Sequence, residues 1–236
     1  MKLLTAKEIK KIVYGIVISD GSIDMKGQRF DLYIKHKEYA EYVYFALSQI
    51  TGMDVHLKLK RDKRGHEGWR VWTRKHAYWK NIGNKLYTGR KTLSKYVCDR
   101  LDPQTFAHIW MCDGYLEHSK NRRKNTVQNI GWFCLESFDK EELELLQNRL
   151  LDFNIKSSLI RKPWGFGWRI RIGGENLQRF ISMIYPYILD CFKYKTVLFY
   201  KSKTPVLTEL SSAEQYVELY STIEDIVRHP MKVGKT

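Results

Sequence analysis

The alternation of hydrophobic and polar residues predicts a helix at the start of the chain, followed by strands and further helices. An almost unbroken apolar run covers residues 12–18, and it follows Thr5 and Glu8, which have the spacing of a capping box. We therefore expect a helix from Thr5 to about Ser19. The later patterns predict strands in 21–30 and 31–37, a helix in 38–52 closed by Gly52, a hairpin in 54–75 and a helix in 76–87.

The hairpin expected in residues 54–75 has a regular period of two. Because successive side chains of a strand point to opposite faces, Val55, Leu57 and Leu59 are expected to face a core. The intervening residues and the alternate residues of the second strand are then expected to point outward: His56, Lys58, Lys60, Arg70, Trp72 and Arg74.

A second series of elements begins at Asp102 and Pro103, a preferred helix cap followed by a preferred first helical residue. The patterns that follow predict a helix in 103–112, strands in 114–119 and 127–137, a helix in 138–153 capped by Ser137, a hairpin in 156–174 and a helix in 175–188 bent at Pro186. The order of elements is the same as in the first series.

Three short matches in the same order support an internal repeat. Asp20-Gly21 returns as Asp113-Gly114, Gly68-Trp69-Arg70 as Gly167-Trp168-Arg169, and Lys91-Thr92 as Lys195-Thr196. We infer two diverged copies of one unit, in residues 1–96 and 97–203. A C-terminal extension, 204–236, follows; its residues 212–229 are expected to form an amphipathic helix packed on the second copy.

Composition indicates the kind of partner. The net charge is +15, from 41 Lys and Arg against 26 Asp and Glu, and such an excess attracts polyanions. No apolar run approaches the roughly 18 residues that span a bilayer, and the N-terminus does not resemble a signal peptide. We therefore expect a nucleic-acid partner, no membrane association, and an intracellular location, cytoplasmic or organellar depending on the host genome.

The cysteines have no spacing typical of a metal site. Cys98, Cys112, Cys134 and Cys191 form no C-x-x-C pair, and the histidines form no H-x-x-x-H pair. This spacing argues against structural zinc and against a disulfide framework, so buried packing roles in a reducing compartment are expected.

The repeated Asp-Gly pairs suggest a shared site. If a pseudo-two-fold axis relates the two copies, Asp20 and Asp113 meet at that axis, where two carboxylates repel unless a cation lies between them. Mg²⁺ suits oxygen ligands, and a paired metal site activates a water and stabilises the leaving oxygen in a displacement at phosphorus. The simpler alternative is that both Asp-Gly pairs only form turns.

Two segments, YGIVISDGS and FAHIWMCDGY, resemble the two degenerate nine-residue motifs of single-chain LAGLIDADG homing endonucleases. The resemblance implies an α+β fold: a pseudo-two-fold pair of αββαββα units whose antiparallel sheets form a DNA-binding saddle. It implies that Asp20 and Asp113 are catalytic and bind Mg²⁺, with Mn²⁺ or Ca²⁺ binding at the same site. It also implies that Lys91 and Lys195 line the active site, where an ammonium stabilises phosphate charge or orients the attacking water.

The resemblance further implies a site-specific endonuclease that hydrolyses both strands of a long, near-palindromic target and leaves short 3′ overhangs, in the service of intron mobility. The expected form is a monomer with internal pseudo-two-fold symmetry that binds double-stranded DNA. No splicing-domain sequence surrounds the repeats, which favours a free-standing, intron-encoded protein. An RNA-splicing maturase, with its own intron RNA as partner, and a non-catalytic DNA-binding protein remain alternatives, although the presence of both aspartates and both lysines favours a nuclease.

Major-groove contacts are expected from the outward faces of the sheets, since Arg and Lys read guanine edges while Asn and Gln read adenine. The candidates in the first copy are Asp24, Lys26, Gln28, Arg29, Lys35, Lys58, Lys60, Arg70 and Arg74. Those in the second copy are Glu117, Gln128, Asn129, Arg161, Arg169 and Arg171. Residues 58–68 and 120–125 are expected to be hairpin tips that grip phosphates. For each residue alone, an ordinary solvated charge is the alternative.

The two motifs differ at the expected helix contact. Gly15 is small enough for close helix approach, whereas His108 occupies the equivalent position in the second motif, so asymmetric packing is expected there. We interpret His108 as a helix-interface residue rather than a metal ligand. Ser19 and Cys112 are small enough to leave the neighbouring carboxylates exposed.

Overall fold

The computed structural model describes residues 3–61, 65–121, 126–162 and 166–198. The expected extension in 204–236 and parts of both expected hairpin tips lie outside these ranges. Within the described residues, no helix has both the length and the apolar character needed to span a bilayer.

Each repeat contains a four-stranded antiparallel sheet with helices against one face. The first repeat consists of α1 (Ala6–Ile18), β1 (Ser22–Asp24), β2 (Arg29–Ile34), α2 (Lys37–Ser48), β3 (Val55–Arg61), β4 (Glu67–Thr73) and α3 (Ala77–Leu86). The second consists of α5 (Pro103–Asp113), β7 (Gly114–Asn121), β8 (Thr126–Phe133), α6 (Lys140–Asp152), β9 (Ser158–Arg161), β10 (Trp168–Gly173) and α7 (Gly174–Ile184).

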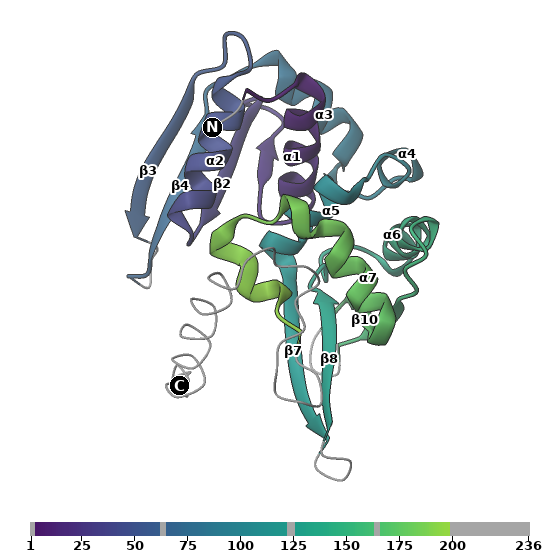
Figure 1. The fold of residues 1–236 in the computed structure, drawn as a ribbon. Coiled ribbons are helices and arrows are strands. Elements are labelled where there is room, and N and C mark those ends of the chain that lie inside the picture. Colours follow the sequence, from purple (N-terminus) through teal and green to yellow (C-terminus); the bar gives the residue numbers. More distant parts are fainter. Residues whose placement is uncertain (1–2, 62–64, 122–125, 163–165, 199–236) are drawn as a thin grey trace.

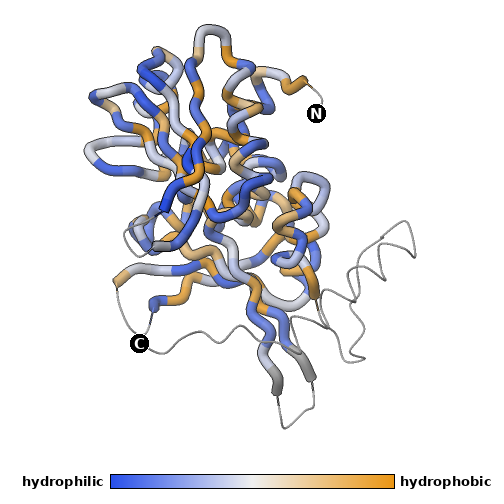
Figure 2. The backbone as a smooth tube through the Cα atoms, turned by 90° about the vertical axis from the view of Figure 1, so that its left-hand side faces the viewer, coloured by the Kyte–Doolittle hydropathy of each residue, from blue (hydrophilic) through white to orange (hydrophobic). Residues whose placement is uncertain are grey.

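The strand orders of the two sheets correspond. They are β1-β2-β4-β3 in the first repeat and β7-β8-β10-β9 in the second. In each repeat, the two hairpins therefore join through the second strand of each hairpin, β2 with β4 and β8 with β10. This arrangement confirms the α+β class and the αββαββα order of both units. Hydrophilic and hydrophobic positions alternate along the strands, as expected for sheets with one buried face (Figure 2).

Short elements join the repeats and follow them. β5 (Tyr87–Thr88), β6 (Arg90–Lys91) and α4 (Lys95–Cys98) lead from the first repeat to the second. Two 3₁₀ segments, η1 (Tyr185–Tyr187) and η2 (Asp190–Thr196), follow α7 and return toward the first repeat (Figure 1). The sequence pattern did not reveal these short elements.

The helix starts of α1 and α5 follow the predicted capping chemistry. The Thr5 side chain accepts the Glu8 backbone N–H at 3.2 Å, and the Glu8 carboxylate accepts the Thr5 backbone N–H at 2.7 Å. At α5, Asp102 accepts the Thr105 backbone N–H at 3.0 Å, and proline occupies the first turn. Both predicted starts are confirmed.

Three other helix boundaries differ from the prediction. α2 ends at Ser48, and Gly52 lies in the following turn with φ of +73°, a conformation that glycine adopts without strain. α6 begins after Asp139 instead of Ser137, because the Glu142 carboxylate accepts the Asp139 backbone N–H at 2.8 Å. α7 ends at Ile184 instead of bending, since Pro186 cannot donate the next helical hydrogen bond.

One predicted core position is also wrong. Leu59 is 44% exposed, whereas Val55 and Leu57 pack against the core. Strand β3 keeps its period of two, but its far end extends beyond the residues that form the core. A period of two therefore gives the face of a strand correctly and does not give the extent of the helix layer over it.

The repeats join through α1 and α5, which pack directly against each other (Figure 1). A Cβ on Gly15 would lie only 2.5 Å from the His108 Cβ and 2.7 Å from the Thr105 carbonyl oxygen, so the close approach requires glycine. Residues 12–18 of α1 are all buried, because this helix packs against α2 of its own repeat and α5 of the other. Burial on every side explains why the apolar run shows no polar face.

Candidate active site and nucleic-acid interface

The packing of α1 on α5 brings the two predicted aspartates into one region. Asp20 follows the C-cap residue Ser19 of α1, and Asp113 is the last residue of α5. The charge of Asp20 contributes to raising the pKa of Asp113, as expected where two carboxyl groups lie near each other. The structure thus combines the two repeat-related residues that the sequence predicts to share a site.

A lysine from each repeat contacts the end of the corresponding helix. Lys91, on β6, donates from Nζ to the carbonyls of Ser19 at 2.7 Å and Gly21 at 3.0 Å. These carbonyls lie on either side of Asp20 in the chain. The carbonyls at a helix C-terminus lack helical partners and carry partial negative charge, so they form a favourable site for an ammonium.

Lys195, on η2, makes the matching contact in the second repeat. Its Nζ donates to the Met111 carbonyl at 2.8 Å and the Cys112 carbonyl at 3.3 Å. In addition, the carbonyl of Lys195 accepts the indole N–H of Trp110 at 3.1 Å, which ties η2 to α5. Both predicted lysines therefore lie beside the helix ends that carry the aspartates.

Both carboxyl groups have a raised pKa. Burial first, and then the charge of Asp20, raise the pKa of Asp113 to about 7, while Lys91 and Lys195 lower it. Asp20 keeps an exposed surface, yet desolvation by the surrounding protein raises its pKa against the opposing effect of the two lysines. A bound cation would offset the repulsion between the two carboxylates and would stabilise the ionised form of each.

The lysines interact across the repeats. The strongest favourable charge on Asp20 is Lys195, from the second repeat, and the strongest on Asp113 is Lys91, from the first. Burial lowers the pKa of both ammonium groups, and the carboxylates oppose this effect. The four side chains form one electrostatic unit with two carboxylates available as oxygen ligands, a donor set that suits a hard cation such as Mg²⁺.

His108 lies in the helix interface and not among the carboxylates. It is 1% exposed, its Nδ1 is 2.9 Å from the Tyr39 hydroxyl, and its ring stacks on Tyr42 with centroids 5.9 Å apart. Burial lowers its pKa to about 3, so the imidazole is neutral at physiological pH. Gly15 of the first motif faces His108 of the second, which gives the asymmetric packing that the sequence predicts.

The strand register decides which predicted DNA-contacting residues share the outward face of the first sheet. Asp24, Arg29, Lys58, Lys60 and Arg70 lie on the face opposite the helices. Lys26 and Gln28 lie between β1 and β2, Lys35 follows β2, and Arg74 follows β4.

Two of these arginines have carboxylate partners in the same repeat, which the sequence analysis did not predict. Asp31, opposite Trp72 in the register, accepts from Arg70 Nε at 2.9 Å, and the Arg70 guanidinium also lies over the Trp72 ring at 5.3 Å. Arg74 pairs with Asp54 at 3.1 Å. Asp31 alternates with the apolar residues Leu32 and Ile34, so the sequence already places its side chain on the outward face of the sheet. This alternation could have revealed Asp31 as a partner for an outward-facing arginine.

In the second sheet, the outward face carries Glu117, Gln128, Arg169 and Arg171. Two of these residues already have partners in the same repeat. Glu117 accepts the indole N–H of Trp132 at 2.8 Å, and Arg169 is ion-paired with Glu136.

Asn129 and Arg161 do not lie on this outward face. Asn129 is opposite His118, whose Nδ1 is 2.8 Å from the Asn129 side-chain oxygen, and Arg161 is opposite Trp168. Both residues therefore project toward the helix side of the sheet. The prediction grouped Gln128 with Asn129, but adjacent strand residues point to opposite faces.

The model of the LAGLIDADG DNA endonuclease family matches residues 10–180. The chain belongs to this family. The two segments that resemble the family's motifs lie in α1 and α5 and in the residues that follow them, and they include Asp20 and Asp113.

Individual relatives of the LAGLIDADG family are distant in sequence. DNA endonuclease I-ChuI of Chlamydomonas applanata is 24% identical over 208 residues, which cover 79% of this chain and 93% of the relative. The structure of the homing endonuclease I-WcaI bound to its DNA recognition sequence is similar with a TM-score of 0.69, at 20% identity, over 84% of this chain and 89% of that one. Meganuclease I-SmaMI bound to uncleavable DNA gives a TM-score of 0.55 at 11% identity, over 100% and 99% of the two chains.

Proposed function

We propose that this LAGLIDADG protein is a monomeric homing endonuclease that cleaves both strands of a long, near-palindromic DNA target inside the cell. The proposal includes short 3′ overhangs and a role in intron mobility. The observation that carries it is the meeting of Asp20 and Asp113 at the ends of two packed helices, each with a lysine on the helix-end carbonyls.

Asp20 and Asp113 would hold Mg²⁺ in this proposal, and Mn²⁺ or Ca²⁺ would bind to the same carboxylates. The metal would supply activation of the attacking water and stabilisation of the leaving oxygen. The oxygen-only donor set and the mutual repulsion that raises the pKa of Asp113 both fit a hard divalent cation.

The lysines are positioned to act on the phosphate or on the water. An ammonium has three N–H donors, and the carbonyl contacts of Lys91 and of Lys195 use two of them in each case. The remaining donor can bind a phosphate oxygen or orient a water while the carbonyls hold the ammonium in place. Fixing the charge before substrate binds avoids reorganisation during the reaction.

The outward sheet faces would lie in the DNA major groove. Arg70 and Arg169 are held by carboxylates in the free protein, and a guanine edge or a phosphate would have to replace those partners. Counterion release by the remaining basic residues would make the affinity fall steeply as salt rises.

The test is cleavage of the intron-less form of the host gene. With Mg²⁺, the chain should cut both strands at one site, sequencing of the ends should show 3′ overhangs, and a chelator should stop the reaction. A chain that binds this DNA and never cuts it would contradict the nuclease proposal. Splicing of the intron RNA by the same preparation without any DNA cleavage would instead support a maturase.

A further inference from the structure

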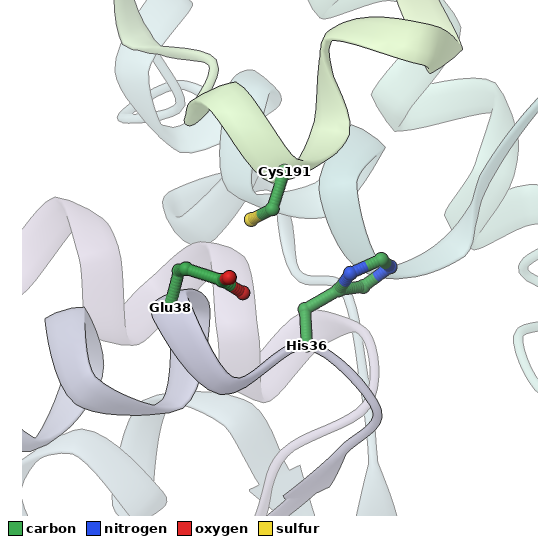
Figure 3. Close-up of side chains that lie close together, drawn as sticks. All are labelled: His36, Glu38 and Cys191. Carbon is green, nitrogen blue, oxygen red and sulfur yellow. The ribbon is translucent and has the colours of Figure 1, made fainter. Parts of the chain in front are cut away.

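Three side chains with metal-binding atoms converge where η2 of the second repeat meets the start of α2 in the first (Figure 3). His36 is the N-cap residue of α2, Glu38 belongs to its first turn, and Cys191 lies in η2. One ligand atom from each residue lies within 4.8 Å of the other two. The three residues come from both repeats, so no spacing motif in the sequence reveals the cluster.

The ligand atoms of His36 and Glu38 are not engaged elsewhere. Among the residues that the structure describes, neither the His36 ring nitrogens nor the Glu38 carboxylate has a hydrogen bond or an ion pair. His36 also provides no side-chain cap to the helix that it precedes. In the close-up the three side chains lie close together, with His36 and Glu38 on the ribbon at the start of α2 and Cys191 on the facing segment (Figure 3).

Aromatic packing fixes the segments that carry these residues. The His36 ring lies 4.4 Å from the Phe192 ring, and Tyr39 contacts the same phenylalanine edge-on at 5.2 Å. Phe192 is buried and directly follows Cys191. The backbone positions of the three candidate ligands are thus set by a packed core, which is the condition for a preorganised metal site.

We propose that His36, Glu38 and Cys191 bind a borderline-soft divalent metal of the Zn²⁺ class, with water as a fourth ligand. Imidazole, carboxylate and thiolate together suit Zn²⁺, whereas Mg²⁺ prefers oxygen ligands only. Tetrahedral bonds of about 2.0–2.3 Å place ligand atoms roughly 3.3–3.8 Å apart. The three ligand atoms, which lie within 4.8 Å of one another, would have to move closer to hold an ion.

The charges around the cluster act in both directions, because Glu38 favours a positive charge at His36 whereas Lys195 and Lys35 oppose it. Burial, and then the Glu38 carboxylate, raise the pKa of the Cys191 thiol, which keeps it neutral without metal. A bound divalent ion offsets both effects, because it stabilises the thiolate and neutralises the carboxylate.

The metal would join the two repeats next to the active site. Cys191 precedes Lys195 on the same 3₁₀ segment, and the charge of Lys195 already contributes to the low pKa of His36. A metal bridge from α2 to η2 would thus hold the segment that delivers Lys195 to the helix-end carbonyls. This role is structural and separate from the oxygen-ligated site at Asp20 and Asp113.

Co²⁺ titration of the untagged full-length chain tests the proposal, in excess Mg²⁺ and in the Asp20→Asn/Asp113→Asn background so that the carboxylate site does not contribute. We expect one Co²⁺ per chain with the charge-transfer absorption of a cobalt–thiolate bond, which one equivalent of Zn²⁺ should displace. Cys191→Ser should abolish this absorption. Cys98→Ala, which removes a buried thiol far from the cluster in sequence, should retain it.

Two further variants test the other ligands. His36→Gln and Glu38→Gln should each weaken Co²⁺ binding at least tenfold, while Glu41→Gln, on the next turn of α2, should leave the affinity unchanged. Absence of cobalt–thiolate absorption in the parent chain would overturn the proposal, and so would its persistence in Cys191→Ser. Circular dichroism shows which variants are folded, and loss of DNA cleavage alone would not affect the outcome.

Discussion

The two repeats differ in how each lysine contacts its motif helix. Lys91 bonds carbonyls on both sides of Asp20, whereas Lys195 bonds two carbonyls that precede Asp113. The helix crossing is also unequal, since Gly15 of one motif accommodates His108 of the other. Both repeats keep a carboxylate and an ammonium at the helix end, while the packing that supports them has diverged. The close approach of α1 and α5 therefore requires a small residue on only one of the two helices.

The largest expected effect is from removing either carboxylate. Asp20→Asn and Asp113→Asn should each reduce cleavage at least about 100-fold with little change in DNA affinity, because each removes a ligand for the cation. Cleavage kinetics and a binding assay in Ca²⁺ measure the two effects separately. Asp99→Asn is the control, since this exposed carboxylate pairs with Lys95 at the start of its own helix. Normal cleavage by either motif variant would contradict the shared site.

Replacing the lysines should have a smaller effect. Lys91→Met and Lys195→Met should each slow cleavage roughly 10- to 100-fold, since each removes a fixed positive charge from the reacting phosphate. The control is Lys95→Met, on an exposed residue of α4. If one motif lysine proves dispensable, the unequal carbonyl contacts reflect unequal roles, and the two halves are not chemically equivalent.

The packing asymmetry predicts a loss of stability. Gly15→Ala should lower the free energy of unfolding by about 1–3 kcal/mol, because the new Cβ would overlap the His108 Cβ and the Thr105 carbonyl. His108→Ala should not rescue it, because alanine retains the Cβ that causes the overlap. Urea denaturation of the two single variants and the double variant measures this. A double variant that is more stable than His108→Ala alone would contradict this prediction. It would show that the two helices can move apart to accommodate the new Cβ.

The raised pKa of Asp113 predicts a pH-dependent difference between variants. In the metal-free fold this carboxyl has a pKa of about 7, against an ordinary value of 3.8, so the folded state holds its proton more tightly than the unfolded state. Its contribution to stability is therefore present below about pH 4 and lost as the pH rises to 7.

Asp113→Asn mimics the protonated carboxyl at every pH. With a chelator present, the variant should match the parent near pH 4 and be at least about 1 kcal/mol more stable at pH 8. Thermal unfolding at several pH values checks the trend, with Asp99→Asn as the variant that should show no such divergence. A constant difference across this range would mean that the carboxyl is not destabilised by burial and by Asp20.

Much of the fold could be predicted from local chemistry. The capping residues of α1 and α5 and the period-two strands are short-range signals, and they gave the element order of both repeats. The ends of α2, α6 and α7 were misplaced because several residues near each end could stop or cap a helix. Leu59 was misplaced because the size of the helix layer is a tertiary property.

The clustering of Asp20, Asp113, Lys91 and Lys195 could be predicted because the repeat doubled a weak signal. A single Asp-Gly or Lys-Thr pair has many explanations, whereas matched pairs in both copies restrict the choice. The ion pairs of Arg70 and Arg169 depend on which strands become neighbours, so the sequence alone did not reveal them. The same is true of His36 and Cys191, which lie in different repeats.

Metal binding at the motif carboxylates tests the central claim, that both repeats contribute to one site, most directly. Electron paramagnetic resonance can count Mn²⁺ bound to the chain in the presence of a DNA duplex with a non-hydrolysable linkage at the cleavage site, in a Cys191→Ser background. We predict that Asp20→Asn and Asp113→Asn each lose bound Mn²⁺, because the proposed site takes one carboxylate ligand from each repeat. Full Mn²⁺ occupancy in both variants would contradict the account.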